Sequence, residues 1–182
     1  MSVDIRFAPS ANTNMKAPPL LPEETLIRVL RVARLDGMSV LVIAGVFALI
    51  SALAGDPVGA VIGLLVAGAG AVELHGATLL EHTDPRGMKW LVSSQLFLLA
   101  TVIAYCALRL LHPAVEPLRG AITDDMKSQL EAAGWSQDEF IRFIYNTTYA
   151  AVAAVTLVYQ GGMALYYFRR REAVTRALGR DV

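Results

Sequence analysis

The chain has 182 residues, of which 55% are hydrophobic and 18% are charged, whereas an ordinary soluble domain carries about 25% charged residues. This composition, with a mean hydropathy of +0.49, predicts a membrane protein. Sixteen Lys and Arg balance sixteen Asp and Glu, so the overall charge indicates neither nucleic acid nor an acidic substrate as a partner. The single cysteine, Cys106, excludes a disulfide within one chain and any Cys-rich redox or zinc site.

The first 36 residues divide into two parts. Residues 1–21 are polar, contain prolines and lack periodicity, which predicts a disordered or extended arm. Residues 22–36 show apolar residues at helical spacing, interleaved with Arg28, Arg31 and Arg34. This pattern predicts an amphipathic interfacial helix on the anionic inner leaflet, with its arginines at the lipid headgroups. A helix packed on a neighbouring subunit is the alternative.

Residues 37–182 contain apolar stretches at about 38–54, 58–79, 90–111 and 143–168. A hydrocarbon core about 30 Å thick is crossed by roughly 20 helical residues. We therefore expect an all-α integral membrane domain with four transmembrane helices in an antiparallel bundle. No apolar signal-peptide core precedes the first stretch, so we expect it to be a retained anchor.

The distribution of Lys and Arg predicts the orientation. Only Arg109, Arg119, Lys127 and Arg142 flank one side of the four stretches, so the other twelve of the sixteen lie on the opposite side. Lys and Arg resist translocation. We expect an inner-membrane protein with both termini in the cytoplasm, a basic cytoplasmic face and an acidic external face. Arg169, Arg170 and Arg171, which follow the fourth stretch, are further headgroup candidates.

The external segment, residues 112–139, carries two capping signals. Thr123 can cap a short helix that Gly134 would end. Ser136 and Glu139 have the spacing of a capping box, which predicts a last helix over about 137–178. Such a helix would extend beyond the membrane into the cytoplasm.

Small residues recur on single helix faces of three stretches, which favours close helix packing in lipid. The second stretch has the clearest face, which Glu73 and Ala77 continue. The predicted packing residues are Gly59, Gly63, Ala67 and Gly70, with Ala44, Ala48, Ser51 and Gly55 on the first stretch and Asn146, Ala150, Ala153, Gln160, Gly161 and Ala164 on the fourth.

Away from the ends of the apolar stretches, where charge is costly, Glu73 and His75 are the residues of the acidic and basic types. Glu73 shares the glycine face, whereas His75 is rotated by about 200°. Glu73 lies at a depth similar to that of four other polar residues. We expect a buried polar cluster of Glu73, Ser94, Gln95, Tyr159 and Gln160. Two roles remain open: a protonated carboxyl that holds the bundle together, or a proton- or cation-binding step on a conduction path.

Cofactor chemistry finds little support in the sequence. His75 and His82 lie on one helix and cannot provide opposite axial ligands to one haem. We expect no cofactor and no metal within one chain, and leave open a haem shared between subunits. Tyr145 and Tyr149 near one interface, and Trp90, Tyr166 and Tyr167 near the other, are typical of aromatic belts.

The sequence lacks a phosphate-binding loop, HExxH and GxSxG, and has no extramembrane segment of catalytic-domain size. These features favour a small non-enzymatic membrane protein that assembles as a homo-oligomer, as a channel or an ion or proton pathway. The alternative is an accessory or anchoring subunit of a larger membrane complex. A membrane-embedded enzyme or redox subunit is third. Expected partners are membrane lipid and other membrane subunits or copies of the chain, with no nucleic acid.

Overall fold

The computed structural model describes residues 21–113, 115–120 and 122–179. Except for Leu21, the predicted N-terminal arm lies outside these residues. All regular secondary structure in these residues is α-helical. Its helices are α1 (Pro22–Leu53), α2 (Pro57–Glu81), α3 (Gly87–Leu111), α4 (Glu116–Arg119), α5 (Asp124–Ala132) and α6 (Gln137–Leu178).

Helices α1, α2, α3 and α6 are long and apolar enough to cross a membrane. Their outer surfaces expose large apolar side chains: Ile43, Leu53 and Val158 are 70%, 89% and 77% exposed. Such surfaces are stable in hydrocarbon and costly in water. The predicted all-α, multi-pass membrane fold is therefore confirmed at the level of these four helices.

Helix α1 is continuous over the boundary that the sequence suggested between an interfacial helix and the first span. Residues 22–36 form the beginning of a helix that runs without a break to Leu53. Val29 and Ala33 on this segment are fully buried. Residues 22–36 therefore continue directly into the first span, and part of the apolar face of this segment packs inside the protein. Its position at the membrane interface stays a prediction.

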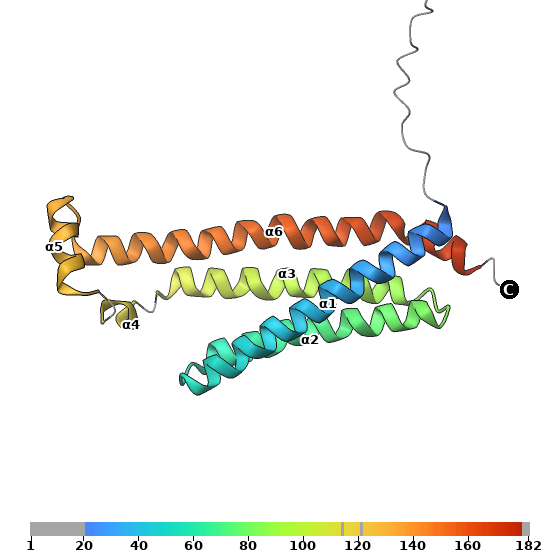
Figure 1. The fold of residues 1–182 in the computed structure, drawn as a ribbon, viewed down its shortest axis with the longest axis horizontal. Helices are drawn as coiled ribbons and strands as arrows, with labels where there is room; N and C mark the ends of the chain where they lie inside the picture. The colour runs from blue at the N-terminus through green and yellow to red at the C-terminus, as the bar shows by residue number, and fades with distance from the viewer. Residues whose placement is uncertain (1–20, 114, 121, 180–182) are drawn as a thin grey trace, which may run out of the picture.

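The four long helices pack together most extensively at one end of the molecule. Helix α1 contacts α2 and α6, and α3 contacts the same two helices. Figure 1 shows the hairpin of α1 and α2 leaving the line of α3 and α6 toward its turn. The main apolar core lies where the helices converge and takes residues from all four: Val29, Ala33, Ala77, Leu80, Met88, Leu91, Tyr167, Val174 and Leu178.

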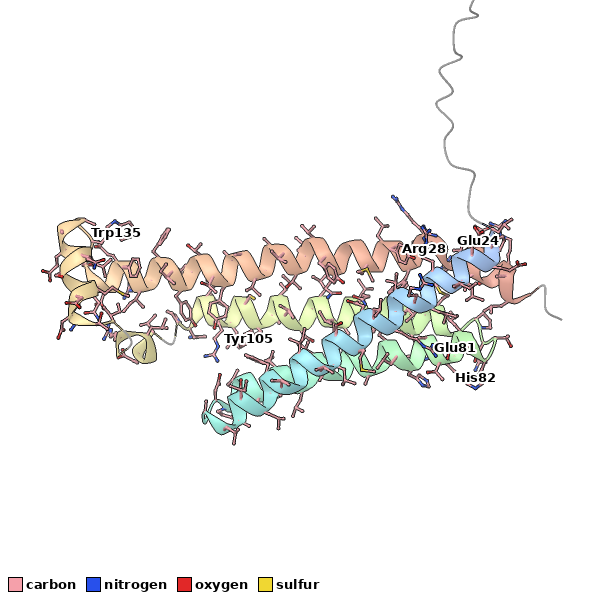
Figure 2. All side chains as sticks on the ribbon, viewed as in Figure 1. Glu24, Arg28, Glu81, His82, Tyr105 and Trp135 are labelled. Carbon is pink, nitrogen blue, oxygen red and sulfur yellow. The ribbon has the colours of Figure 1, made fainter. Side chains whose placement is uncertain are left out.

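Helices α1 and α3 begin at this convergent end, and α2 and α6 end there. We call it the arginine-rich end, because the arginines of early α1 and late α6 lie there. Figure 2 shows Arg28, Glu81 and His82 at this end, whereas Tyr105 and Trp135 lie toward the other. Arg34 forms an ion pair with Glu81 across α1 and α2.

The α1–α2 packing follows the small residues that the sequence singled out. A Cβ atom added to Gly63 would lie 2.8 Å from the Cβ of Ala48, and one added to Gly70 would lie 2.7 Å from the backbone oxygen of Gly37. Ala67 is buried as well. Only residues without a larger side chain allow the two backbones to approach so closely.

The fourth stretch differs from this prediction. Ala150 is exposed, and a Cβ atom added to Gly161 meets no atom within 4 Å. Within one chain, these two residues therefore make no close helix contact. Gln160 and Ala164 are buried, so the inward face of α6 passes through these positions and on to Tyr167.

Local capping explains where the helices begin. The turn before α2 uses Gly55 at φ +73°, and the Asp56 carboxylate accepts a hydrogen bond from the Gly59 amide at 3.0 Å. At the start of α6, the Ser136 hydroxyl accepts from the Glu139 amide and the Glu139 carboxylate accepts from the Ser136 amide. The predicted capping box and the predicted extent of the last helix are thus present.

Candidate functional site

Two carboxyl groups lie buried between the four long helices. Asp36 comes from α1 and Glu73 from α2, and the side chains of Gln95 from α3 and of Tyr159 and Tyr167 from α6 surround them. We call these five residues the carboxyl cluster. Because each long helix contributes to it, the cluster links the whole transmembrane domain.

Hydrogen bonds connect the cluster. The Tyr167 hydroxyl donates to Glu73 Oε1 at 2.7 Å. The Tyr159 hydroxyl donates to Asp36 Oδ1 at 2.9 Å, and Gln95 Nε2 donates to Asp36 Oδ2 at 3.0 Å. The Glu73 carboxyl lies close enough to the side chains of Asp36 and Gln95 to interact with both electrostatically. Both oxygens of Asp36 therefore accept a hydrogen bond from a neutral donor.

Both carboxyls are withdrawn from the surface: Glu73 is 1% exposed and Asp36 is 8% exposed. Among the described ion pairs, none joins a Lys, Arg or His to either carboxyl. Two neighbouring carboxylates without a cation repel each other, and burial removes the water that would stabilise them. Two charged carboxylates at this position would therefore be costly without a counter-charge.

The close approach of α1 and α2 explains why the carboxyls meet. Gly37 follows Asp36, and Gly70 lies one helical turn before Glu73. A Cβ atom added to Gly70 would lie 2.8 Å from the Leu41 amide nitrogen, so the helix backbones touch beside the pair. The glycine face of α2 thus positions Glu73 against α1.

Unpaired polar atoms accompany the cluster. Gln95 Oε1 is buried and lacks a hydrogen-bond partner in the structure, although the same amide donates to Asp36. Gln160 Oε1 is also buried and unpaired. An unpaired buried acceptor costs roughly 1 to 3 kcal/mol. Gln95 therefore adds an acceptor beside the two carboxyls, with a preference for a proton donor or a cation.

The structure brings together three of the five predicted site residues. Glu73, Gln95 and Tyr159 all contact or flank Asp36. Ser94 is buried, but its hydroxyl donates to the Leu91 carbonyl of its own helix at 2.9 Å.

Gln160 is buried two turns from Tyr167 on α6, and no hydrogen bond joins it to the cluster in the described part of the chain. The role of the five predicted residues as an ion or proton site stays a prediction.

Asp36 and Tyr167 are cluster residues that the sequence did not predict. Asp36 is the last residue of the predicted interfacial helix, just outside the first apolar stretch, and Tyr167 belongs to a predicted aromatic belt. The spacing of the two carboxyls from the α1–α2 turn could have predicted that Asp36 lies beside Glu73. Asp36 and Glu73 lie at similar distances along the chain from the turn at Asp56, so an antiparallel hairpin places them at one level.

A second polar group lies at the opposite end of the bundle. Arg109 on α3 forms an ion pair with Asp56 at 2.8 Å, and its Nε donates to the Tyr105 hydroxyl at 3.1 Å. The Tyr105 ring also contacts the Tyr149 ring of α6, with 5.9 Å between centroids. This ion pair connects the α1–α2 turn to α3, where the apolar packing is thinner.

The ligand types that commonly hold metal ions are scattered in the described ranges. These ranges contain no group of three or more His, Cys, Asp or Glu that could hold a metal ion. His75 is exposed and its ring packs edge-on against Trp90 at 5.7 Å.

The predicted headgroup residues Arg28, Arg31, Arg34, Arg169 and Arg171 are exposed. The Arg170 guanidinium lies 4.8 Å from the centroid of the Tyr166 ring. Their contact with lipid stays a prediction.

Comparison with known proteins adds no relative. No protein-family model matches the chain, and neither the curated proteins nor the solved structures contain a match. A function must therefore be argued from the geometry of the chain itself.

Proposed function

We propose that the chain is a small, non-enzymatic inner-membrane protein that assembles as a homo-oligomer and binds protons at the carboxyl cluster as one step of an ion or proton pathway. The observation that supports this proposal is the Asp36–Glu73 pair, buried without a cationic partner among the described residues. Ionisable groups within membrane helices are costly, and they commonly serve proton relays and ion pathways.

The hydrogen bonds divide the two carboxyls by role. Asp36 accepts from Tyr159 and Gln95, and such donors stabilise a carboxylate. Glu73 is more deeply buried and accepts from Tyr167. In our proposal, Asp36 holds the negative charge and Glu73 carries the exchangeable proton.

An oligomer is part of the proposal because one chain offers little room for a water-filled route. Side chains fill the space around the cluster: Leu91 and Tyr167 are fully buried nearby in the core. Meanwhile α6 carries Gly161 and Gly162, where an added Cβ atom would meet no atom within 4 Å in the described part of the chain. Close approach of another helix would bury these positions.

The decisive experiment measures proton flux in liposomes. Purified protein is reconstituted with a pH-sensitive dye inside, and a potassium diffusion potential drives protons inward. We expect flux with the natural chain and only background flux with Glu73→Gln, which keeps the shape and the acceptor oxygen but cannot release a proton. Glu81→Gln, on the same helix but outside the cluster, is the control: it loses the ion pair with Arg34 and leaves the carboxyl cluster intact.

Two results contradict the proposal. Proton flux with the natural chain that equals that of empty liposomes removes the pathway. Equal flux for Glu73→Gln and Glu81→Gln removes Glu73 from it.

Infrared spectroscopy tests the protonation assignment without any flux. A carboxyl that holds a proton shows a carbonyl stretch that a carboxylate lacks. We expect this band in the natural chain and in Asp36→Asn, and expect it to disappear in Glu73→Gln. A band that instead disappears in Asp36→Asn reverses the two roles.

The accessory-subunit function is the second candidate. The uncovered Gly161 and Gly162 on α6 favour it as much as they favour self-association. The native mass after extraction in a mild detergent distinguishes the two. Whole-number multiples of one chain mass support the homo-oligomer, whereas stoichiometric co-purification of other chains supports the accessory subunit.

A further inference from the structure

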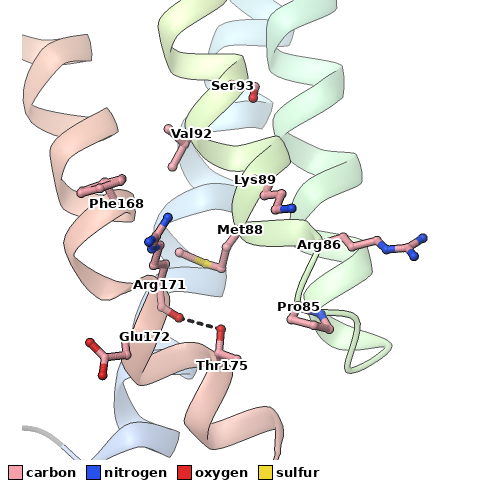
Figure 3. Close-up of a pocket in the computed structure, with 10 residues that line it drawn as sticks. All are labelled: Pro85, Arg86, Met88, Lys89, Val92, Ser93, Phe168, Arg171, Glu172 and Thr175. Carbon is pink, nitrogen blue, oxygen red and sulfur yellow. Dashed lines mark hydrogen bonds between the residues drawn. The ribbon is translucent and has the colours of Figure 1, made fainter.

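A groove opens between α3 and α6 at the arginine-rich end. It has a volume of about 740 Å³ and extends from the α2–α3 turn along the first turns of α3 and the last turns of α6. Figure 3 shows Met88 and Val92 from α3 facing Phe168 from α6 across it. The part of the groove between these three side chains is therefore apolar. We call it the apolar wall.

The rim of the groove is basic. Arg86, Lys89 and Arg171 line it, against the single carboxylate of Glu172. Figure 3 shows the Arg86 guanidinium turned away from α6, and the Lys89 and Arg171 side chains on the two sides of Met88. None of these three basic side chains forms an ion pair in the described part of the chain. Glu172 lies 4.0 Å from Arg176 of its own helix, and Figure 3 shows its carboxylate turned away from α3. The groove therefore has a net positive charge.

The position of the groove relative to the apolar spans decides what kind of anion fits. Lys89 immediately precedes the apolar run of α3, and Phe168 ends that of α6. The basic rim thus lies at the level of lipid headgroups, and the apolar wall leads into the hydrocarbon. The Arg171 guanidinium lies 4.8 Å from the Phe168 ring centroid, which holds this cation beside the apolar wall.

We propose that this groove binds one anionic phospholipid, with its phosphate held by Lys89 and Arg171 and an acyl chain along Val92 and Phe168. Basic pockets between transmembrane helices on the cytoplasmic side bind anionic headgroups through the same chemistry. Free phosphate shares the charge but cannot use the apolar wall. This proposal does not depend on the carboxyl cluster.

Native mass spectrometry from nanodiscs tests the proposal. Nanodiscs that contain equal amounts of phosphatidylglycerol and phosphatidylcholine should release the protein with phosphatidylglycerol bound. The combined change Lys89→Gln and Arg171→Gln should weaken this binding roughly tenfold to thirtyfold, because each cation near the surface contributes about a factor of five. Arg176→Gln removes a charge from the same helix outside the groove and should retain the lipid.

Thermal unfolding in a zwitterionic detergent provides the second measurement. Added phosphatidylglycerol should raise the Tm of the natural chain and of Arg176→Gln more than that of the doubly changed chain, because a ligand stabilises the state that binds it. Equal retention of both lipids, or equal retention by the doubly changed chain and Arg176→Gln, overturns the proposal. A Tm increase with inorganic phosphate as large as with the lipid also overturns it, because the ligand is then a soluble anion.

Discussion

At the scale of single residues, the central feature is a pair of carboxyls stabilised by neutral donors. Tyr167, Tyr159 and Gln95 donate to oxygens that water would otherwise solvate. Each hydrogen bond to a buried acceptor prevents a desolvation cost. The cluster therefore contributes to stability, apart from any proton transfer. Substitution of Tyr167, compared with substitution of its neighbour Tyr166, measures this contribution.

Tyr167→Phe should destabilise the protein by about 1 to 3 kcal/mol, because it leaves Glu73 Oε1 buried without its donor. Tyr166→Phe is the control, since the Tyr166 hydroxyl is buried but has no partner. Its removal should leave stability unchanged or raise it, because no hydrogen bond is lost and an unpaired buried hydroxyl is removed. Unfolding by a denaturing detergent measures both changes. An equal loss for the two variants contradicts the hydrogen bond.

A surface carboxylate allows a prediction of pH dependence. Lys127 Nζ donates to Asp124 at 2.7 Å, and this hydrogen bond lowers the pKa of Asp124 below its ordinary value. Because the folded-state pKa is lowered, the contribution to α5 is present above the ordinary pKa and is lost as the pH falls through the lowered one. Lys127→Gln should raise the pKa of Asp124 toward its ordinary value, as an NMR titration can measure. An unchanged pKa contradicts the pairing.

At the scale of helices, the α1–α2 hairpin is the element that the sequence predicted in most detail. The glycine face of α2 can be recognised in the sequence because helices in lipid associate through close packing, which requires small residues at the contact. The start of α6 can be predicted because Ser136 and Glu139 cap it through hydrogen bonds between residues three apart in the chain. Local chemistry and helical spacing are sufficient for both features.

Other features depend on tertiary packing, which spacing alone does not show. Asp36 looks like a boundary charge until α2 places Glu73 beside it. Tyr167 looks like an interface anchor until the inward face of α6 is known. Ala150 and Gly161 have the spacing of a packing face, but α3 contacts α6 along a different face. The cluster was therefore only partly predictable.

Gly70→Ala tests the close approach of the two helices. The added methyl group would lie 2.7 Å from Gly37 O and 2.8 Å from Leu41 N, both backbone atoms. Because the backbone cannot move aside as a side chain can, we expect a loss of about 1 to 3 kcal/mol. Gly68→Ala, where a Cβ meets no atom within 4 Å, should be neutral or slightly stabilising. Thermal unfolding of both variants in one detergent makes the comparison, and equal Tm values contradict the close contact.

At the scale of the whole molecule, the balanced net charge conceals an uneven distribution. Basic residues gather at the end where the four long helices converge, and the residues around α4 and α5 include several carboxylates. The positive-inside rule relates this asymmetry to the direction of insertion. In the proposed pathway, the orientation would decide which aqueous phase supplies protons to the carboxyl cluster, because the cluster lies nearer the arginine-rich end.

The single cysteine makes the orientation measurable. Cys106 is 1% exposed, so Cys106→Ser supplies an unreactive background. In that background, Ser128→Cys places a thiol on exposed α5 and Glu23→Cys places one on the exposed first turn of α1. We expect a membrane-impermeant maleimide to label Ser128→Cys in cells with a permeable outer envelope, and to label Glu23→Cys only after the inner membrane is opened. Labelling of Glu23→Cys before that step would mean that the arginine-rich end faces outward, and the proton that reaches Glu73 would then come from the external side.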